Sequence, residues 1–195
     1  MMHPFRLTCS IALLALAFDH SPAQAQAAVA DVWSQLGDGS VLLYRHANAP
    51  GIGDPPNFKL GDCSTQRNLD NAGRRQATRI GQALRERGVL VSAVWASPWC
   101  RTIETAALAF PAQKVVAQAA FASFFNDVDR RPAQTGDAQA LLQAWRGPGP
   151  LVVVTHQVNI TALTGLGSAS GEGVALRWNG GLDGRWQVLG RLPAP

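Results

Sequence analysis

The chain has 195 residues with a formal net charge of +4, and 47% of its residues are hydrophobic. That composition fits one domain with a hydrophobic core. Because the basic residues are scattered rather than gathered in runs, the sequence does not indicate a nucleic-acid-binding surface. Isolated surface arginines need no function, so a role for any one arginine has to be argued from its position.

Residues 1–27 have the pattern of a secretory signal peptide. Arg6 supplies a positive start, Ile11 to Phe18 form an apolar stretch, and Ala25-Gln26-Ala27 offers a cleavage site. The apolar stretch is far shorter than the ~20 residues that cross a bilayer. We therefore expect cleavage, a periplasmic or secreted protein without stable membrane insertion, and one domain over 28–195. A retained amphipathic anchor is the alternative.

Apolar runs and helical patterns then alternate along the chain. We expect strands at 41–45, 91–97, 114–117 and 151–155, and helices at 71–87, from 98 or 99 to 110, at 137–145 and from 157 to 164. Two further segments, 173–178 and 185–189, flank Asn179-Gly180-Gly181 and are typical of an antiparallel pair. The alternation predicts an α/β fold, a three-layer α/β/α sandwich with a mostly parallel central sheet and a terminal antiparallel edge.

Without the leader, only two histidines remain, and each follows an apolar run. His46 directly follows the run from Val41 to Arg45, and His156 directly follows the run from Leu151 to Thr155. Continuous apolar runs are typical of buried parallel strands, and ligands in open α/β sheets bind beyond the carboxyl ends of such strands. Both imidazoles are therefore expected where a substrate binds.

Two arginines also lie close to the ends of predicted strands. Arg45 directly precedes His46, and Arg101 lies in the first turn of the helix that follows the second predicted strand. A neutral histidine can attack phosphorus, and guanidinium groups stabilise the charge of a phosphoryl group. The start of a helix also favours an anion. These residue types predict a phosphate site.

In these residues the sequence resembles the histidine phosphatase superfamily, with its phosphoglycerate-mutase-like fold, over roughly residues 40 to 178. The motifs are Arg45-His46-Ala47, Leu69 to Ala77, Ser97 to Ala106, and Thr155-His156 followed by Asn159-Ile160. Their combination is specific, whereas any one of them is not. Ala47 replaces the usual glycine, a small change that a slightly different turn could absorb. Asn48 stands where mutases of the family often carry glutamate, and the domain is short for a mutase; both features favour hydrolysis over phosphoryl transfer between sugar positions.

The resemblance implies a phosphoric monoester hydrolase of the histidine acid type. His46 would be the nucleophile, with Arg45, Arg101 and His156 around the phosphoryl group, and no metal or other cofactor is called for. Small exported members, such as the lipopolysaccharide core heptose phosphatases, look most similar. A protein phosphohistidine phosphatase and a non-catalytic protein that binds phosphate or sugar phosphate are the alternatives.

The leaving group of an ester needs a proton, so a carboxylic acid is expected in the site. In the family this donor tends to follow the arginine-bearing helix and the next short strand. Asp127 lies there, after Phe124-Phe125, and is our choice. Glu172 is the rival, and Asp129 could instead be a solvated charge.

The long segment 47–69 is rich in Gly, Pro, Asp and Asn, and its length favours a binding role. Its polar side chains suit hydroxyl groups, and it offers little apolar surface for a lipid, so we expect a polar, sugar-like phosphomonoester. The polar side chains in question are Asp54, Asn57, Lys59, Asp62 and Gln66.

Five more residues have open assignments. Arg67, Arg74 and Trp99 could extend the substrate site, although ordinary surface exposure explains the two arginines equally well. Cys63 and Cys100 could form a disulfide in an oxidising compartment, which the sequence leaves open. A catalytic cysteine is disfavoured, because no histidine adjoins either one.

Overall fold

The structure is a computed structural model that describes residues 32–179 and 186–195. The predicted signal peptide and the turn at Gly180-Gly181 lie outside these residues. In the part of the chain that is described, no helix combines the length and the apolar character needed to cross a membrane.

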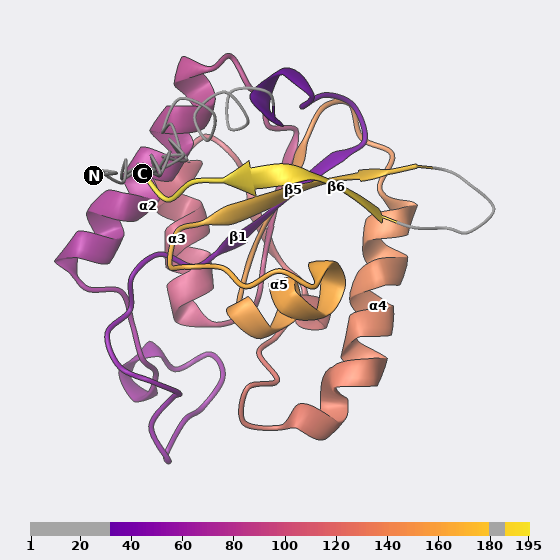
Figure 1. The fold of residues 1–195 in the computed structure, drawn as a ribbon. Helices are drawn as coiled ribbons and strands as arrows, with labels where there is room; N and C mark the ends of the chain where they lie inside the picture. Colours follow the sequence, from indigo (N-terminus) through magenta and orange to yellow (C-terminus); the bar gives the residue numbers. More distant parts are fainter. Residues whose placement is uncertain (1–31, 180–185) are drawn as a thin grey trace, which may run out of the picture.

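A six-stranded sheet forms the centre of the molecule, with the strand order β3-β2-β4-β1-β5-β6 (Figure 1). The strands are β1 (Ser40–Arg45), β2 (Ala93–Ala96), β3 (Val115–Ala117), β4 (Leu151–Thr155), β5 (Gly173–Trp178) and β6 (Trp186–Leu192). Strands β1 to β4 are mutually parallel, whereas β5 is antiparallel to β1 and β6 to β5. The expected mostly parallel sheet with an antiparallel edge is confirmed.

Helices cover both faces of this sheet. On one face lie α2 (Asn71–Glu86) and α3 (Cys100–Ala109), and on the other α4 (Arg131–Ala144) and α5 (Gln157–Thr164) (Figure 1). One core contains Ile80 and Leu84 of α2, and the other contains Leu142 of α4 and Ile160 of α5. The expected α/β/α sandwich is therefore confirmed.

The two cores explain why β1 reads as an unbroken apolar run. Leu42 and Tyr44 point into the core under α2 and α3, whereas Val41 and Leu43 point into the core under α4 and α5. Successive side chains of a strand alternate between the faces of its sheet, so a strand covered on both faces is apolar at every position.

Two predicted boundaries are wrong by more than one residue at their start. Helix α4 begins at Arg131 rather than 137 because Pro132 lies in its first turn, where proline is well tolerated, and Gly136 lies inside it. Strand β2 covers 93–96 rather than 91–97, and the preceding Ser92 N–H donates to the Pro150 carbonyl outside the ladder. Strand β6 continues to Leu192, beyond the predicted end at 189. The remaining differences, at the ends of β1, α2, α3, β3 and α4 and at the start of β6, are of one or two residues, the usual variation at element ends.

Candidate active site

His46 and His156 lie side by side beyond the carboxyl ends of two neighbouring parallel strands. Arg45 of β1 pairs with Thr155 of β4, and the next N–H along β1, that of His46, donates to the Thr155 carbonyl at 2.9 Å. The centroids of the two imidazole rings are 5.5 Å apart, and both rings are buried. The adjacent strand β2 leads into α3 and thereby places Arg101 at the same edge of the sheet.

These side chains line a cavity of about 780 Å³. Seven of the eight residues predicted for the site belong to its lining, namely Arg45, His46, Arg67, Trp99, Arg101, Asp127 and His156. Arg74 does not. Its guanidinium is half-exposed and forms an ion pair with Glu104 at 2.6 Å. The prediction that Arg74 binds substrate is therefore wrong, and the structure gives it the alternative role of a surface residue.

The hydrogen bonds of His46 leave one ring nitrogen free for chemistry. Nδ1 of His46 lies 2.7 Å from the carbonyl oxygen of Ala47, so in the neutral ring Nδ1 carries the proton and donates it to that oxygen. Nε2 then keeps its lone pair, and no described residue hydrogen-bonds to it. Burial, assisted by the positive charge of the neighbouring arginines, lowers the pKa of His46 to about 3, although the Ala47 hydrogen bond acts in the opposite direction. The imidazole is therefore neutral and nucleophilic at physiological pH.

His156 is held by a hydroxyl group. Its Nε2 lies 2.8 Å from Ser97 Oγ, and the Trp99 N–H points at the same oxygen from 3.5 Å. The hydroxyl proton of Ser97 is thus available to Nε2, which leaves Nδ1–H of His156 as a donor. Burial, followed by the proximity of His46 and of Arg101, lowers the pKa of His156 well below its ordinary value. His156 can therefore donate a hydrogen bond to a phosphoryl oxygen while remaining uncharged.

Arg45 and Arg101 bring donors to the same cavity. Arg45 is anchored through its Nη1, which donates to the Ser168 carbonyl at 2.8 Å and to Gln157 at 3.3 Å. The Nε–H groups of Arg45 and Arg101 are buried, and neither has a hydrogen-bond partner among the described residues. A buried guanidinium donor without a partner is costly, and a phosphoryl oxygen is an acceptor of the right charge for it.

Asp54 is a site residue whose role the sequence did not predict. Its two carboxylate oxygens accept from Nη1 and Nη2 of Arg101 at 2.7 and 3.1 Å, and one of them also accepts from the Trp99 indole at 3.0 Å. Burial raises the pKa of Asp54, but the hydrogen bonds and charge of Arg101, with further donors from Arg67 and Trp99, outweigh it and hold the pKa below its ordinary value. The ionised carboxylate therefore fixes the orientation of Arg101.

The only sequence signal for Asp54 was its place in the long segment, which marked it as one polar side chain among five. A cavity with several arginines needs a counter-charge, and that argument could have singled out an acidic residue nearby. It could not have chosen among Asp54, Asp62 and Asp127.

Arg67 lines the cavity but mainly holds the segment that follows β1. Its guanidinium donates to the carbonyls of Ala49 and Gly53, and its backbone N–H donates to Asp54 at 3.1 Å. The residue thus fixes the backbone around Asp54. Its charge also contributes to the lowered pKa of both imidazoles, after burial and alongside Arg101.

A disulfide fastens the long segment to the start of α3. Cys63 and Cys100 are bonded, with their Cα atoms 5.7 Å apart, which settles the pairing that the sequence left open. Close by, the rings of Phe58 and Trp99 are stacked at 5.3 Å, and the Cys100 N–H donates to Gln66 Oε1 at 3.0 Å. Segment 54–66 is therefore attached to the residues that flank Arg101.

The helix motif Leu69 to Ala77 secures the turn that follows His46. Gln76 accepts from the Asn48 N–H at 2.9 Å, and the Asn48 side chain donates to Asp70, which caps α2. A Cβ atom on Gly73 would lie 2.0 Å from the Asn48 carbonyl oxygen, so only glycine fits there. Ala47 itself is buried, and no non-glycine residue in the described ranges has positive φ. Alanine is accommodated where the family usually has glycine.

The acidic candidates separate by position. Asp127 lines the cavity, and none of the described residues forms a hydrogen bond with its carboxylate. Glu172 lies outside the cavity lining, where it pairs with Arg191 at 2.8 Å and accepts from the Ala169 N–H. Asp129 is not part of the lining either. The other acidic lining residue, Asp54, is paired with Arg101, whereas no ion pair involves Asp127 in the described ranges.

Four of the five polar side chains expected to bind hydroxyl groups lie elsewhere. Asn57, Lys59, Asp62 and Gln66 do not line the cavity, and only Asp54 does. Asp62 accepts from Ser64, and Gln66 bonds to the Lys59 carbonyl and the Cys100 N–H. The segment was expected to offer little apolar surface for a lipid, and it exposes two large apolar side chains, Ile52 at 92% and Leu60 at 54%. These polar groups stabilise the segment itself.

In the described ranges, no group of three or more His, Cys, Asp or Glu side chains is arranged to hold a metal ion.

The family model of the histidine phosphatase superfamily (branch 1) matches residues 41–122. No curated protein matches the sequence. Among solved structures, the protein histidine phosphatase SixA complexed with tungstate is similar at a TM-score of 0.56 with 14% identity, over 80% of this chain and 97% of that one. A mycobacterial glucosyl-3-phosphoglycerate phosphatase in complex with VO3 is similar at a TM-score of 0.53 with 15% identity, over 76% of this chain and 96% of that one.

The chain is thus similar to the histidine phosphatase superfamily over residues 41–122, and its fold is that of solved phosphatases. Residues 41–122 include His46 and Arg101, whereas His156 lies beyond the matched range and is brought to them by the pairing of β1 with β4.

Proposed function

We propose that this protein is an exported phosphomonoesterase that hydrolyses a small phosphate ester through a phosphohistidine intermediate on His46. The observation that carries the proposal is the free Nε2 of a neutral, buried His46 in a cavity shared with Arg45, Arg101 and His156. This combination provides a nucleophile and donors aimed at one place, which is what phosphoryl transfer requires.

In the first step, the lone pair of His46 Nε2 forms a bond to phosphorus while the bond from phosphorus to the leaving oxygen breaks. The Arg45 and Arg101 guanidinium groups and the His156 imidazole donate to the phosphoryl oxygens. Asp127 gives its proton to the leaving oxygen, so an alcohol departs and phosphorylated His46 remains.

In the second step, water attacks phosphorus and the bond between phosphorus and Nε2 breaks. The Asp127 carboxylate takes up the proton of the attacking water, which restores the acid for the next cycle. Inorganic phosphate leaves, and His46 returns to its neutral form.

Export is supported by the signal-like pattern of residues 1–27 and by the disulfide, because disulfides persist in oxidising compartments. A protein phosphohistidine phosphatase is a second candidate, supported by the structural likeness to SixA. The small ester is preferred because the nucleophile is buried in a cavity of about 780 Å³.

Hydrolysis of p-nitrophenyl phosphate tests the proposed function, because its good leaving group needs little help from an acid. We expect turnover by the mature chain and none by His46→Ala, with the fold checked by circular dichroism. Competitive binding of vanadate without any turnover would contradict the proposal and favour a phosphate-binding protein. A phosphohistidine peptide hydrolysed far more efficiently than any small ester would favour the second candidate.

A further inference from the structure

We propose that the substrate is a phosphomonoester with an apolar leaving group, such as an alkyl or aryl alcohol, rather than a sugar. This inference rests on the proposed function and concerns the outer part of the same cavity. The two histidines, Arg45 and Arg101 form the phosphate site, and by the outer part we mean the lining residues of segments 51–58 and 124–128, which include the apolar side chains of Ile52, Phe58, Phe124, Phe125 and Val128.

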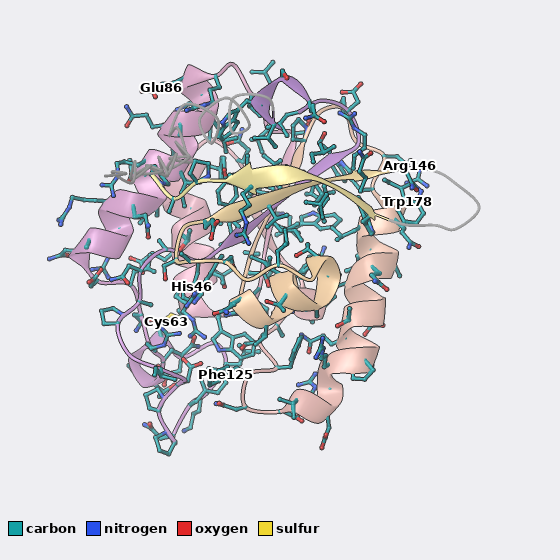
Figure 2. The ribbon with its side chains drawn as sticks, viewed as in Figure 1. His46, Cys63, Glu86, Phe125, Arg146 and Trp178 are labelled. Carbon is teal, nitrogen blue, oxygen red and sulfur yellow. A yellow bond between two sulfur atoms is a disulfide. The ribbon has the colours of Figure 1, made fainter. Side chains whose placement is uncertain are left out.

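Three of the seven exposed large apolar side chains in the described ranges line this cavity. In the described ranges, Ile52 is 92% exposed, Val128 68% and Phe125 52%, and all three line it. Soluble proteins expose large apolar side chains singly without consequence, but a group of them around one opening marks a binding surface. Figure 2 shows Phe125 at the same end of the molecule as His46 and Cys63, away from Glu86 and Arg146.

The two apolar segments approach each other across the cavity. A Cβ atom placed on Gly53 would lie 3.9 Å from both Phe125 Cε1 and Asn126 Oδ1, so a methyl group at Gly53 would be in van der Waals contact with the second segment. Behind Gly53, Phe58 is stacked on Trp99, whose indole N–H is already bound to Asp54. Phe58, Trp99 and Phe125 all line the cavity, and the stacking covers one face each of Phe58 and Trp99.

Both segments are anchored to the core, so the apolar surface is held in place. The Ala122 carbonyl, just before Phe124 and Phe125, accepts from the side chains of Asn159 and Gln134. The opposite segment is held by Arg67 and by the disulfide. A surface that is fixed before the ligand arrives binds it with a smaller entropy cost.

Most polar side chains of the cavity are already engaged within the protein. Gln157 accepts from Arg45, Ser123 Oγ accepts from the Phe125 N–H, and the Thr161 hydroxyl donates to the Leu166 carbonyl, which leaves Asn126 and Asp127 as the uncommitted amide and carboxyl groups of the described lining. Asp54 and Arg67 are engaged with Arg101 and with backbone carbonyls, and the four other polar side chains expected for a sugar lie outside the lining. Arg130 and Arg131 line the cavity but are exposed, so they can stay hydrated beside an uncharged leaving group.

A series of n-alkyl phosphates from ethyl to octyl, used below the concentrations at which they form micelles, tests the inference. The alcohols of this series have nearly the same basicity, so the chemistry of bond cleavage stays constant. Burial of one methylene contributes roughly 0.8 kcal/mol, or about fourfold. We expect kcat/KM to rise about two- to fourfold per methylene at first, mainly through KM.

The substitution Ile52→Asn should lower kcat/KM for octyl phosphate about three- to tenfold relative to that for ethyl phosphate. Leu90→Asn is the matched control, since Leu90 is 83% exposed and lies outside the cavity lining. The Leu90→Asn substitution should leave kcat/KM unchanged for every member of the n-alkyl phosphate series. A flat series, or glucose 6-phosphate preferred to hexyl phosphate, would overturn the inference. If p-nitrophenyl phosphate is hydrolysed in that case, the proposed function stands, whereas loss of all turnover contradicts both.

Discussion

The orientation of Arg101 depends on a single carboxylate. Asp54 accepts from both terminal nitrogens of the guanidinium and leaves Nε–H as a free donor. Because hydrogen bonds to charged groups contribute about 1.5–3 kcal/mol, we expect Asp54→Asn to reduce kcat/KM for p-nitrophenyl phosphate by roughly 10- to 100-fold. The inhibition constant for vanadate should rise in parallel, since both depend on how Arg101 meets an oxyanion.

Asp62→Asn is the control for this substitution. Asp62 belongs to the same segment but caps Ser64 outside the cavity lining, and its replacement should change neither quantity by more than twofold. Unchanged vanadate inhibition in Asp54→Asn would show that Arg101 keeps its orientation without the carboxylate.

Asp127 should matter only when the leaving group is a poor one. An alkoxide needs a proton as the bond to phosphorus breaks, whereas p-nitrophenolate does not. We expect Asp127→Asn to lower kcat for butyl phosphate about 10²- to 10⁴-fold and to affect p-nitrophenyl phosphate far less. Asp129→Asn, which changes a neighbouring acid outside the lining, should behave like the unmodified chain. If kcat fell equally for butyl phosphate and p-nitrophenyl phosphate, a group other than Asp127 would protonate the leaving oxygen.

Residue roles could be predicted from the sequence where topology alone fixes a position. His46 and His156 meet because each follows a buried strand, and parallel neighbours end at the same edge of a sheet. Asp54 could not be predicted in this way. It is 47 positions from Arg101 in the sequence, and its direction depends on how the long segment folds back over α3.

At the level of elements, the segment between β1 and α2 is held by the Cys63–Cys100 bond. The two cysteines are 37 residues apart, and the chain-entropy relation gives a stabilisation of about 4 kcal/mol for a loop of that length. We expect the double substitution Cys63→Ser and Cys100→Ser to lower the free energy of unfolding by roughly 2–4 kcal/mol. KM should also increase, because Phe58 and Asp54 lie on the released segment.

Urea denaturation and steady-state kinetics measure these two effects. Dithiothreitol should reproduce both in the unmodified chain and have no effect on the double variant. An unchanged unfolding midpoint in the variant would contradict the stabilising role of the bond.

Element prediction succeeded where one pattern dominated and failed where two competed. Strands β1 and β4 face a core on both sides, so their apolar runs have no other explanation. The start of α4 was missed because Gly136 is typical of loops, while the helix is favoured by Pro132 in its first turn and by the burial of Gln134 and Ala138. That burial comes from tertiary packing, which a local pattern does not contain.

For the whole molecule, the two buried histidines make stability depend on pH. In the unfolded chain a histidine gains its proton near pH 6.5, whereas burial first, and then the nearby arginines, lower the pKa of folded His46 to about 3 and that of His156 well below its ordinary value. Between these values the unfolded state binds more protons, so the free energy of unfolding falls as the pH falls. The slope approaches about 1.4 kcal/mol per pH unit for each histidine below pH 6.

Chemical denaturation at pH 7, 6 and 5 measures this slope, and the variant His156→Gln should show about half of it. The lowered pKa of Asp54 also makes the free energy of unfolding fall as the pH falls. This effect begins only near the ordinary pKa of about 4, so Asp54 does not contribute between pH 7 and pH 5. Constant stability from pH 7 to pH 5 would mean that the imidazoles accept protons within the fold.

The phosphorylated form of His46 is the central claim, and trapping it is the most direct test. The protein is mixed with ³²P-labelled substrate, quenched within the first turnover, digested and mapped by peptide. We predict label on the peptide that contains His46, stable in base and lost in acid, and no label in His46→Ala. Label on a serine or a cysteine, or turnover by the unmodified chain without any labelled protein, would contradict the mechanism.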